Sequence, residues 1–217
     1  MPLGELFEVI RGPLVEAVVV AGCAATLVIY HVGLARRIRT QPEMTTMGRH
    51  RLLRSAWAKL PKSADRELVV VQSMRNLIMS ASFLASTAVL LAAGFLGAVS
   101  TTDKLSTFAQ SLNLIGVESL SFWLLKALLL AVTFLVVFFA FTLAIRSFNH
   151  TWMTNACAQD TDVGEEAVAG EIESGALAYA IGMRGLYVSI PLLLWLFGPI
   201  WLLGGTLLLV MVLRRID

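Results

Sequence analysis

Residues 120–145 read LSFWLLKALLLAVTFLVVFFAFTLAI, and Lys126 is the only charged residue among them. As an α-helix that rises about 1.5 Å per residue, this stretch is longer than the hydrocarbon core of a bilayer, which is about 30 Å thick. A helix also pairs its own backbone amides, as lipid requires. The stretch therefore predicts a transmembrane helix.

Comparable apolar stretches lie on both sides of it, at residues 13–34, 68–99 and 186–213. We predict an all-α integral membrane protein, with four transmembrane helices in one bundle and a single membrane domain over residues 1–217. Pro191 and the Gly198-Pro199 pair are expected kinks in the fourth helix. The chain is 57% hydrophobic and only 15% charged, a balance that excludes a water-soluble globular domain.

Positive charges gather in the connection at residues 35–66, which carries Arg36, Arg37, Arg39, Arg49, Arg51, Arg54, Lys59, Lys62 and Arg66. The next connection carries only Lys104. Short cytoplasmic loops are enriched in Lys and Arg, so residues 35–66 are expected in the cytoplasm of a multi-pass protein of the cell inner membrane. Four crossings would then leave both termini extracytoplasmic, although Arg214 and Arg215 at the C-terminus oppose this orientation.

Both cytoplasmic connections are expected to contain amphipathic helices. Within residues 46–60, Leu53, Trp57 and Leu60 recur at helical spacing among basic residues, which suits a helix lying on an anionic leaflet. Residues 160–185 are acidic and predict a second cytoplasmic helix that continues into the fourth span. The two helices could pair through their charges, or each could present a solvated face, because exposed ion pairs contribute little.

Polar side chains mark the inner end of every predicted span: His31, Gln72, Arg75, Asn76, Arg146, Asn149, His150 and Arg184. Together they offer many hydrogen-bond donors and would favour an anion, such as a phosphate headgroup or a small carboxylate. The simpler interpretation of each arginine is an interfacial anchor. Gln72 and Asn76 do not aid orientation, so we expect them to hydrogen-bond across helices or to a ligand.

Two of these residues permit a sharper alternative. His31 and His150 each end an odd-numbered span, so their imidazoles could face each other and hold a haem iron or another metal. A structural hydrogen-bond network is the simpler role for both histidines.

Three further features concern the outer halves and the packing of the spans. Glu16 is an intramembrane acid and thus a functional suspect, but we expect it to reach the outer interface. Lys126 is expected to extend outward in the same way. Ala81, Ala85, Ala88 and Ala92 form one stripe of the second span, where a neighbouring helix can approach closely.

The sequence also resembles a known family. Tyr30-His31, Gln72-x-x-Arg75-Asn76-Leu77-Ile78-Met79 and Arg146-x-x-Asn149-His150 are similar to motifs of a family of four-span membrane proteins, the domain of unknown function numbered 599. The resemblance would extend from about Pro13 to Leu213. It implies the four-span layout and marks the same polar layer, but it implies no activity.

Two classes of function remain open. In the first, the protein is a non-catalytic membrane protein: a subunit of a larger assembly, a homo-oligomer or a scaffold that engages anionic lipid headgroups. In the second, it has a working site, either as a transporter or channel for small anions or as a haem protein. No Walker loop, HExxH or GxSxG motif is present, so the sequence favours a protein that is not an enzyme. Nucleic acid is not an expected partner.

Overall fold

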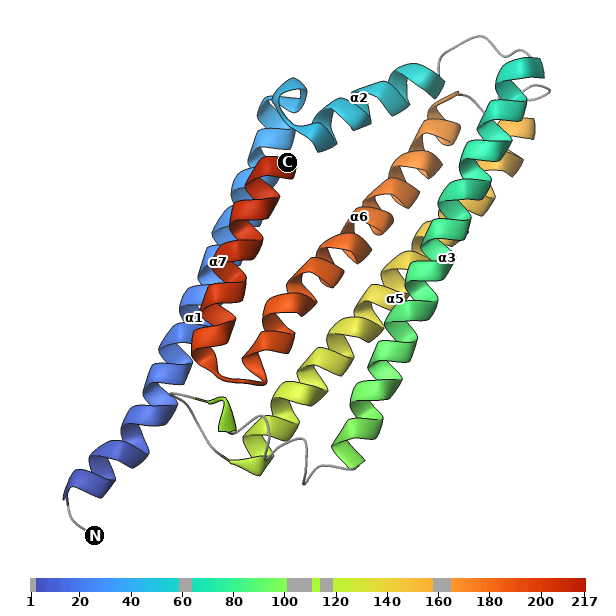
Figure 1. Cartoon of the computed structure of the whole chain (residues 1–217). Coiled ribbons are helices and arrows are strands. Elements are labelled where there is room, and N and C mark those ends of the chain that lie inside the picture. The colour runs from blue at the N-terminus through green and yellow to red at the C-terminus, as the bar shows by residue number, and fades with distance from the viewer. Residues whose placement is uncertain (1–2, 59–63, 101–110, 114–118, 158–164) are drawn as a thin grey trace. The chain divides into compact units, whose positions relative to one another are not determined.

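A computed structural model describes residues 3–58, 64–100, 111–113, 119–157 and 165–217. The principal elements of this part are all helices, as the sequence predicts, and Figure 1 labels them. They are α1 (Leu3–Thr40), the short 3₁₀ helix η1 (Pro42–Met44), α2 (Thr46–Ala58), α3 (Ala64–Ser100), α5 (Leu120–Cys157), α6 (Glu165–Trp195) and α7 (Pro199–Ile216).

Five of the described helices are long and apolar enough to cross a membrane, over Gly12–Thr40, Leu68–Gly97, Leu120–Thr151, Ala167–Trp195 and Pro199–Ile216. The all-helical membrane fold is confirmed, but the described residues hold five helices of spanning length where we predicted four. The stretch 186–213 is two helices, because α6 ends at Trp195 and α7 runs back in the opposite direction (Figure 1). The prediction that both termini are extracytoplasmic depended on an even number of crossings and loses that basis.

The reversal between α6 and α7 has a local cause at Gly198. Its N–H bonds to the carbonyl oxygen of Trp195 at 3.0 Å, and its φ of 127° is a conformation that favours glycine. A Cβ at this position would lie 2.5 Å from Asn113 Oδ1. Pro199 then occupies the start of α7, where a missing N–H costs nothing. The Gly198-Pro199 pair therefore makes a turn rather than the kink that we predicted.

The acidic segment leads into the next span without a break. Residues 160–185 were predicted to form a cytoplasmic helix that continues into the fourth span, and α6 is continuous from Glu165 to Trp195, with a span-length section that begins at Ala167. At about 1.5 Å per residue, such a helix is longer than the hydrocarbon core. Its acidic first turns can therefore lie at the headgroups while the rest of the helix crosses the lipid.

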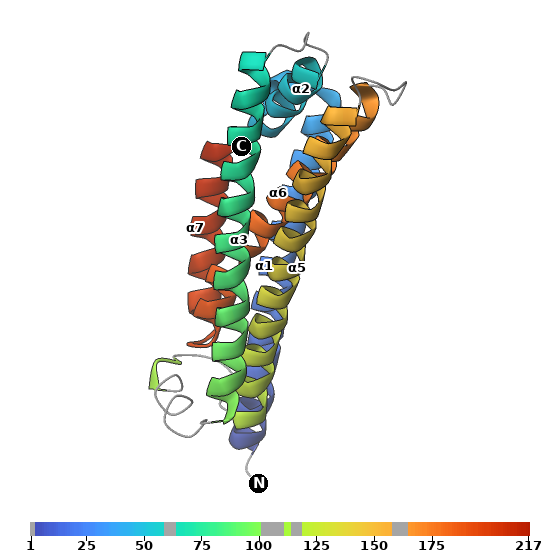
Figure 2. The ribbon, with the colours of Figure 1, turned by 90° about the vertical axis from the view of Figure 1, so that its right-hand side faces the viewer.

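The chain divides into two compact units, defined by residues far apart in sequence. The first unit comprises Met1–Arg36, Leu91–Phe134 and Leu186–Asp217, and the second comprises Arg37–Leu90 and Leu135–Gly185. Four helices, α1, α3, α5 and α6, contribute residues to both units. Figure 2 shows α3 and α5 as unbroken helices.

In the first unit, α1 packs against α7 and the end of α6. Cys23, Trp195 and Leu202 form a buried cluster there, and Cys23 is a free thiol. The Tyr30 hydroxyl donates a hydrogen bond to the Asp217 carboxylate. The C-terminal end of α7 therefore lies beside the C-terminal half of α1.

In the second unit, α6 approaches α5 closely because its contact face carries glycines. A Cβ on Gly175 would lie 2.6 Å from the ring of Phe148, and one on Gly182 would lie 2.9 Å from that of Phe141. The alanine stripe of α3 is also buried, as predicted, with Ala81 and Ala88 fully enclosed. Such small residues let helices pack where lipid supplies no hydrophobic driving force between them.

Candidate functional site

The eight predicted polar residues occupy mostly exposed positions. His31 belongs to the first unit and is half-buried, with Nδ1 2.8 Å from the carbonyl oxygen of Leu27 in its own helix. The other seven belong to the second unit, where Arg184 is half-buried and its Nη2 lies 3.9 Å from Met47 Sδ. The remaining six are exposed: Gln72, Arg75, Asn76, Arg146, Asn149 and His150. A shared ligand for these eight side chains stays a prediction.

The amphipathic helix α2 contributes to a better-defined candidate site. It begins at Thr46, as the sequence predicts. Thr45 is buried, and its Oγ1 accepts a hydrogen bond from the Gly48 N–H at 3.1 Å, which caps the helix. A Cβ on Gly48 would lie 2.3 Å from the carbonyl oxygen of Pro42. The start of α2 is therefore packed tightly against the preceding 3₁₀ turn.

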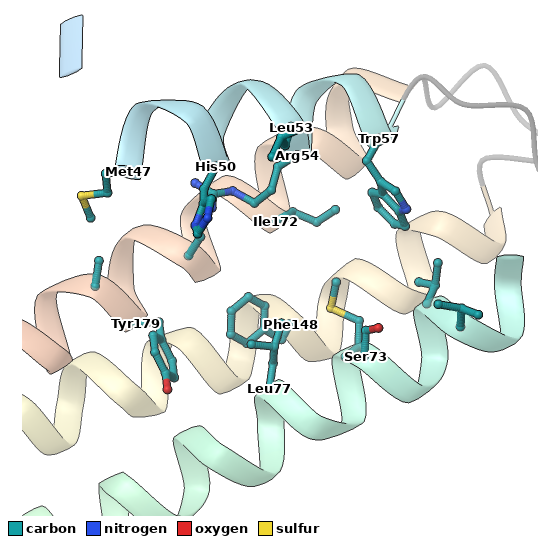
Figure 3. Close-up of a pocket in the computed structure, with 15 residues that line it drawn as sticks. Met47, His50, Leu53, Arg54, Trp57, Ser73, Leu77, Phe148, Ile172 and Tyr179 are labelled. Carbon is teal, nitrogen blue, oxygen red and sulfur yellow. The ribbon is translucent and has the colours of Figure 1, made fainter. Parts of the chain in front are cut away.

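Beyond this turn, α2 lies over a cavity of about 750 Å³ within the second unit. In Figure 3 the side chains of α2, among them Trp57, lie on one side of the cavity, with Leu77 of α3 and Phe148 of α5 opposite them. Ala176 and Tyr179 of α6 complete the lining. The walls are predominantly apolar, and the volume lies in the range of about 300–1,000 Å³ that is typical of small-molecule sites.

Polar groups join this apolar lining mainly on the α2 side, where His50 and Arg54 line the cavity. Arg54 donates from Nε and Nη2 to Glu173 Oε2 on α6, at 3.2 Å and 2.9 Å. Arg51 Nε lies 3.5 Å from the other carboxylate oxygen of Glu173. The basic and acidic helices therefore do pair, and two arginines share one carboxylate, which leaves an excess of positive charge beside the cavity.

A second polar cluster lies in the first unit and was missed by the sequence reasoning. Glu16 of α1 and Lys126 of α5 form an ion pair in which both side chains are at least 97% buried, since their exposed fractions are 2% and 3%. The indole N–H of Trp195 donates to Glu16 Oε1 at 2.9 Å. Lys126 Nζ also lies 4.7 Å from the ring centroid of Phe122. The expectation that both charges extend to the outer interface is wrong.

The ion pair could have been predicted from the two charges considered together, but not from either charge alone. Glu16 and Lys126 have opposite sign, and both lie in the half of an apolar span that faces away from residues 35–66. Charges at a similar depth in lipid are expected to find each other, because an unpaired charge is costly there. The cavity had only one sequence signal, the apolar face of α2 that carries Trp57.

Comparison with known proteins gives a family but no activity. The model of the family described as "Protein of unknown function, DUF599" matches residues 18–217, a range that includes every residue lining the cavity. Comparisons with curated proteins and with solved structures each gave no match. Because the family match covers nearly the whole chain, the protein belongs to the DUF599 family of proteins of unknown function.

Proposed function

We propose that this protein is a non-catalytic, lipid-engaging membrane protein that binds an anionic phospholipid in the cavity under α2. An acyl chain would enter the apolar part of the cavity, and the phosphate would lie at Arg54. The observation that carries the proposal is the combination of a cavity of about 750 Å³, walls that are mainly apolar and an arginine in its lining. A lipid has the same two parts, a charged head and an apolar chain.

The depth of the cavity supports a lipid rather than a wholly polar ligand. On α3 the lining residues Val69 to Leu77 belong to the first turns of the span-length section Leu68–Gly97. On α6, Ile172 to Ala180 belong likewise to the first half of its span. Trp57 adds an aromatic side chain of the kind that is enriched at the membrane interface. A site at this level would meet both the headgroups and the upper parts of the acyl chains.

We further propose that this end of the second unit faces the cytoplasm. With five crossings, the N-terminus would be extracytoplasmic and the C-terminus cytoplasmic, so that Arg214 and Arg215 join the positive charges of residues 35–66. A reporter that is active only in the cytoplasm, fused after Asp217, should be active. An inactive cytoplasmic reporter, together with an active periplasmic one at the same position, would contradict this topology.

The lipid proposal is tested by an arginine exchange with a matched control. The protein is purified in a neutral detergent and titrated with dioctanoyl phosphatidylglycerol or dioctanoyl phosphatidylcholine, and the shift in thermal unfolding is measured. Arg54→Gln should weaken the apparent affinity for phosphatidylglycerol about tenfold, since a hydrogen bond to a charged group contributes roughly 1.5–3 kcal/mol. Arg49→Gln removes the same charge from an exposed position of α2 outside the cavity lining and should change little. Equal responses of the two variants would show that only total charge matters.

A second pair of variants tests whether the acyl chain enters the cavity. Ala176 lines the cavity, whereas its neighbour Leu177 is exposed and does not. Ala176→Phe should fill part of the cavity and weaken binding of the dioctanoyl lipid. Leu177→Phe should leave binding unchanged, and weakened binding in that variant alone would place the acyl chain elsewhere.

The alternatives that the sequence left open are a small-anion transporter or channel and a haem protein that uses His31 and His150. The predominantly apolar lining of the cavity favours a lipid over a small anion, and neither histidine is among its lining residues. His31 directs one ring nitrogen to its own helix, and His150 is exposed. We therefore favour the lipid site.

A further inference from the structure

We infer that Glu173 is an internal competitor of the lipid headgroup, which takes the positions on Arg54 and Arg51 that the phosphate would occupy. This inference rests on the proposed lipid site and adds its regulation. Binding would then be an exchange of partners, in which the arginines leave one carboxylate and take up one phosphate.

The geometry of the ion pair makes the two partners mutually exclusive. Arg54 directs two N–H groups, from Nε and Nη2, to a single oxygen of Glu173. The same fork of donors suits two oxygens of a phosphate. Arg51 lies 3.5 Å from the second carboxylate oxygen. A headgroup that bound both arginines in this way would have to displace Glu173.

The exposure of the pair makes the exchange inexpensive. The side chains of Arg54 and Glu173 are 30% and 38% exposed, so water can solvate the carboxylate once it is released. Ion pairs with this access to solvent contribute little to stability. The pair therefore holds the arginines in place without binding them so strongly that a lipid cannot compete.

Other contacts would keep α2 over the cavity during the exchange. The capped start of α2 is fixed by Thr45 and Gly48, and Trp57 near its end packs against the core cluster of the second unit, which includes Val70, Phe148 and Ile172. The change required is thus a rotation of side chains at Glu173 and the two arginines. No separation of α2 from α6 is needed.

The charges favour an anionic lipid over a zwitterionic one. Two arginines face one carboxylate in the ion pair, so the α2 side of the cavity carries an excess of positive charge. A phosphatidylethanolamine headgroup presents the opposite possibility, with its phosphate at Arg54 and its ammonium at Glu173. In that arrangement Glu173 would contribute to binding instead of opposing it, and the two cases predict opposite effects of neutralising this residue.

The test measures the apparent Kd for dioctanoyl phosphatidylglycerol, phosphatidylethanolamine and phosphatidylcholine in the full chain and in Glu173→Gln, by titration in neutral detergent. We expect Glu173→Gln to bind phosphatidylglycerol about two- to fivefold more tightly, the range that a partly exposed ion pair of up to about 1 kcal/mol allows. Glu171→Gln is the matched control, because it removes the same charge two residues away, on a different face of α6. That control should bind phosphatidylglycerol with nearly the affinity of the parent.

The outcomes separate this inference from the proposal on which it rests. If Arg54→Gln weakens phosphatidylglycerol binding and Glu173→Gln leaves it unchanged, the lipid site stands and the competition is refuted. Equal tightening in Glu173→Gln and Glu171→Gln would reduce the effect to net charge and also refute it. Loss of phosphatidylethanolamine binding in Glu173→Gln would make Glu173 a ligand rather than a competitor. If Arg54→Gln binds phosphatidylglycerol as the parent does, the lipid site itself fails.

Discussion

The two units each contain an ion pair, and the two pairs differ mainly in their access to water. In the first unit, the Glu16 and Lys126 side chains are almost fully enclosed. In the second unit, the Arg54 and Glu173 side chains are about one-third exposed and lie beside a cavity. Under the proposed exchange, the same kind of charge interaction would serve two purposes. The enclosed pair cannot change partners without leaving a bare charge in an apolar core, whereas the exposed pair can.

The enclosed pair is surrounded by groups that compensate for the loss of water. The Trp195 indole donates to Glu16, and the ammonium of Lys126 lies over the rings of Phe122 and Trp195. Cation–π contacts of this kind strengthen when they are desolvated. The cluster joins α1, α5 and the end of α6, next to the turn into α7. We interpret it as a structural lock of the first unit.

The largest expected effect comes from breaking this lock on one side. Lys126→Met removes the ammonium and leaves Glu16 in an apolar core without its ion-pair partner. Removing one member of a buried pair costs about 3–5 kcal/mol. Unfolding by sodium dodecyl sulfate in mixed micelles measures the change, with Leu125→Met as the control at an exposed neighbouring position.

A double variant separates the cost of the unpaired charge from the value of the pair. Glu16→Gln combined with Lys126→Met removes both charges, and buried pairs can be replaced by uncharged groups with little loss. We expect the double variant to be clearly more stable than Lys126→Met alone. If the two variants are equally unstable, the aromatic packing around Lys126 rather than its charge holds the first unit together.

A second prediction asks what holds α2 in the second unit, where the ion pair is weak. Gly48→Ala should destabilise the protein by about 2–3 kcal/mol, because the new methyl group would meet the backbone carbonyl of Pro42, which cannot move freely. The measurement is the free energy of unfolding in neutral detergent, together with lipid-dependent stabilisation. Gly22→Ala is the control, since nothing lies within 4 Å of the added Cβ. Equal behaviour of the two variants would contradict tight packing at the start of α2.

A third prediction compares a buried indole hydrogen bond with an exposed one. Trp195→Phe removes the donor to Glu16 and keeps an aromatic ring, so the expected loss is about 1.5 kcal/mol. Trp201 also uses its indole N–H, at 3.3 Å to the carbonyl oxygen of Leu112, but it is exposed. Trp201→Phe should therefore cost less than about 0.5 kcal/mol. The free energy of unfolding of both variants, measured by chemical unfolding, tests this prediction. A larger loss of stability for Trp201→Phe would show that the exposed hydrogen bond matters more than the buried one.

The sequence predicted the fold where the signal is local. Three apolar stretches and the start of α2 at Thr46 follow from helical periodicity and length, and the structure confirms them. The reversal at Gly198 was not predictable in the same way, because a proline and a glycine signal a kink and a turn equally well. The unexplained arginines Arg214 and Arg215 were the available sign that one crossing was missing from the four-span layout.

The candidate site was less predictable because it depends on which helices become neighbours. The pairing of Glu16 with Lys126 joins residues from two spans, and no local pattern specifies it. The amphipathic face of α2 predicted contact with lipid, but the cavity exists only because α2 lies against α3, α5 and α6. By contrast, pairing between the basic and acidic segments was one of two alternatives that the sequence left open, and Arg54 and Glu173 form such a pair.

The loss of stability expected from opening the second pair is small, and it is the most informative for the comparison of the two pairs. Arg54→Gln opens the exposed pair, and in a neutral detergent it should lower the free energy of unfolding by less than about 1 kcal/mol, because Glu173 regains water. Titration with phosphatidylglycerol should then show that this variant has lost most of the stabilisation that the parent protein gains. A loss comparable to that of Lys126→Met would mean that the second pair is a structural lock as well. A small loss of stability combined with a large loss of lipid response would show that exposure to water is what frees an ion pair for binding.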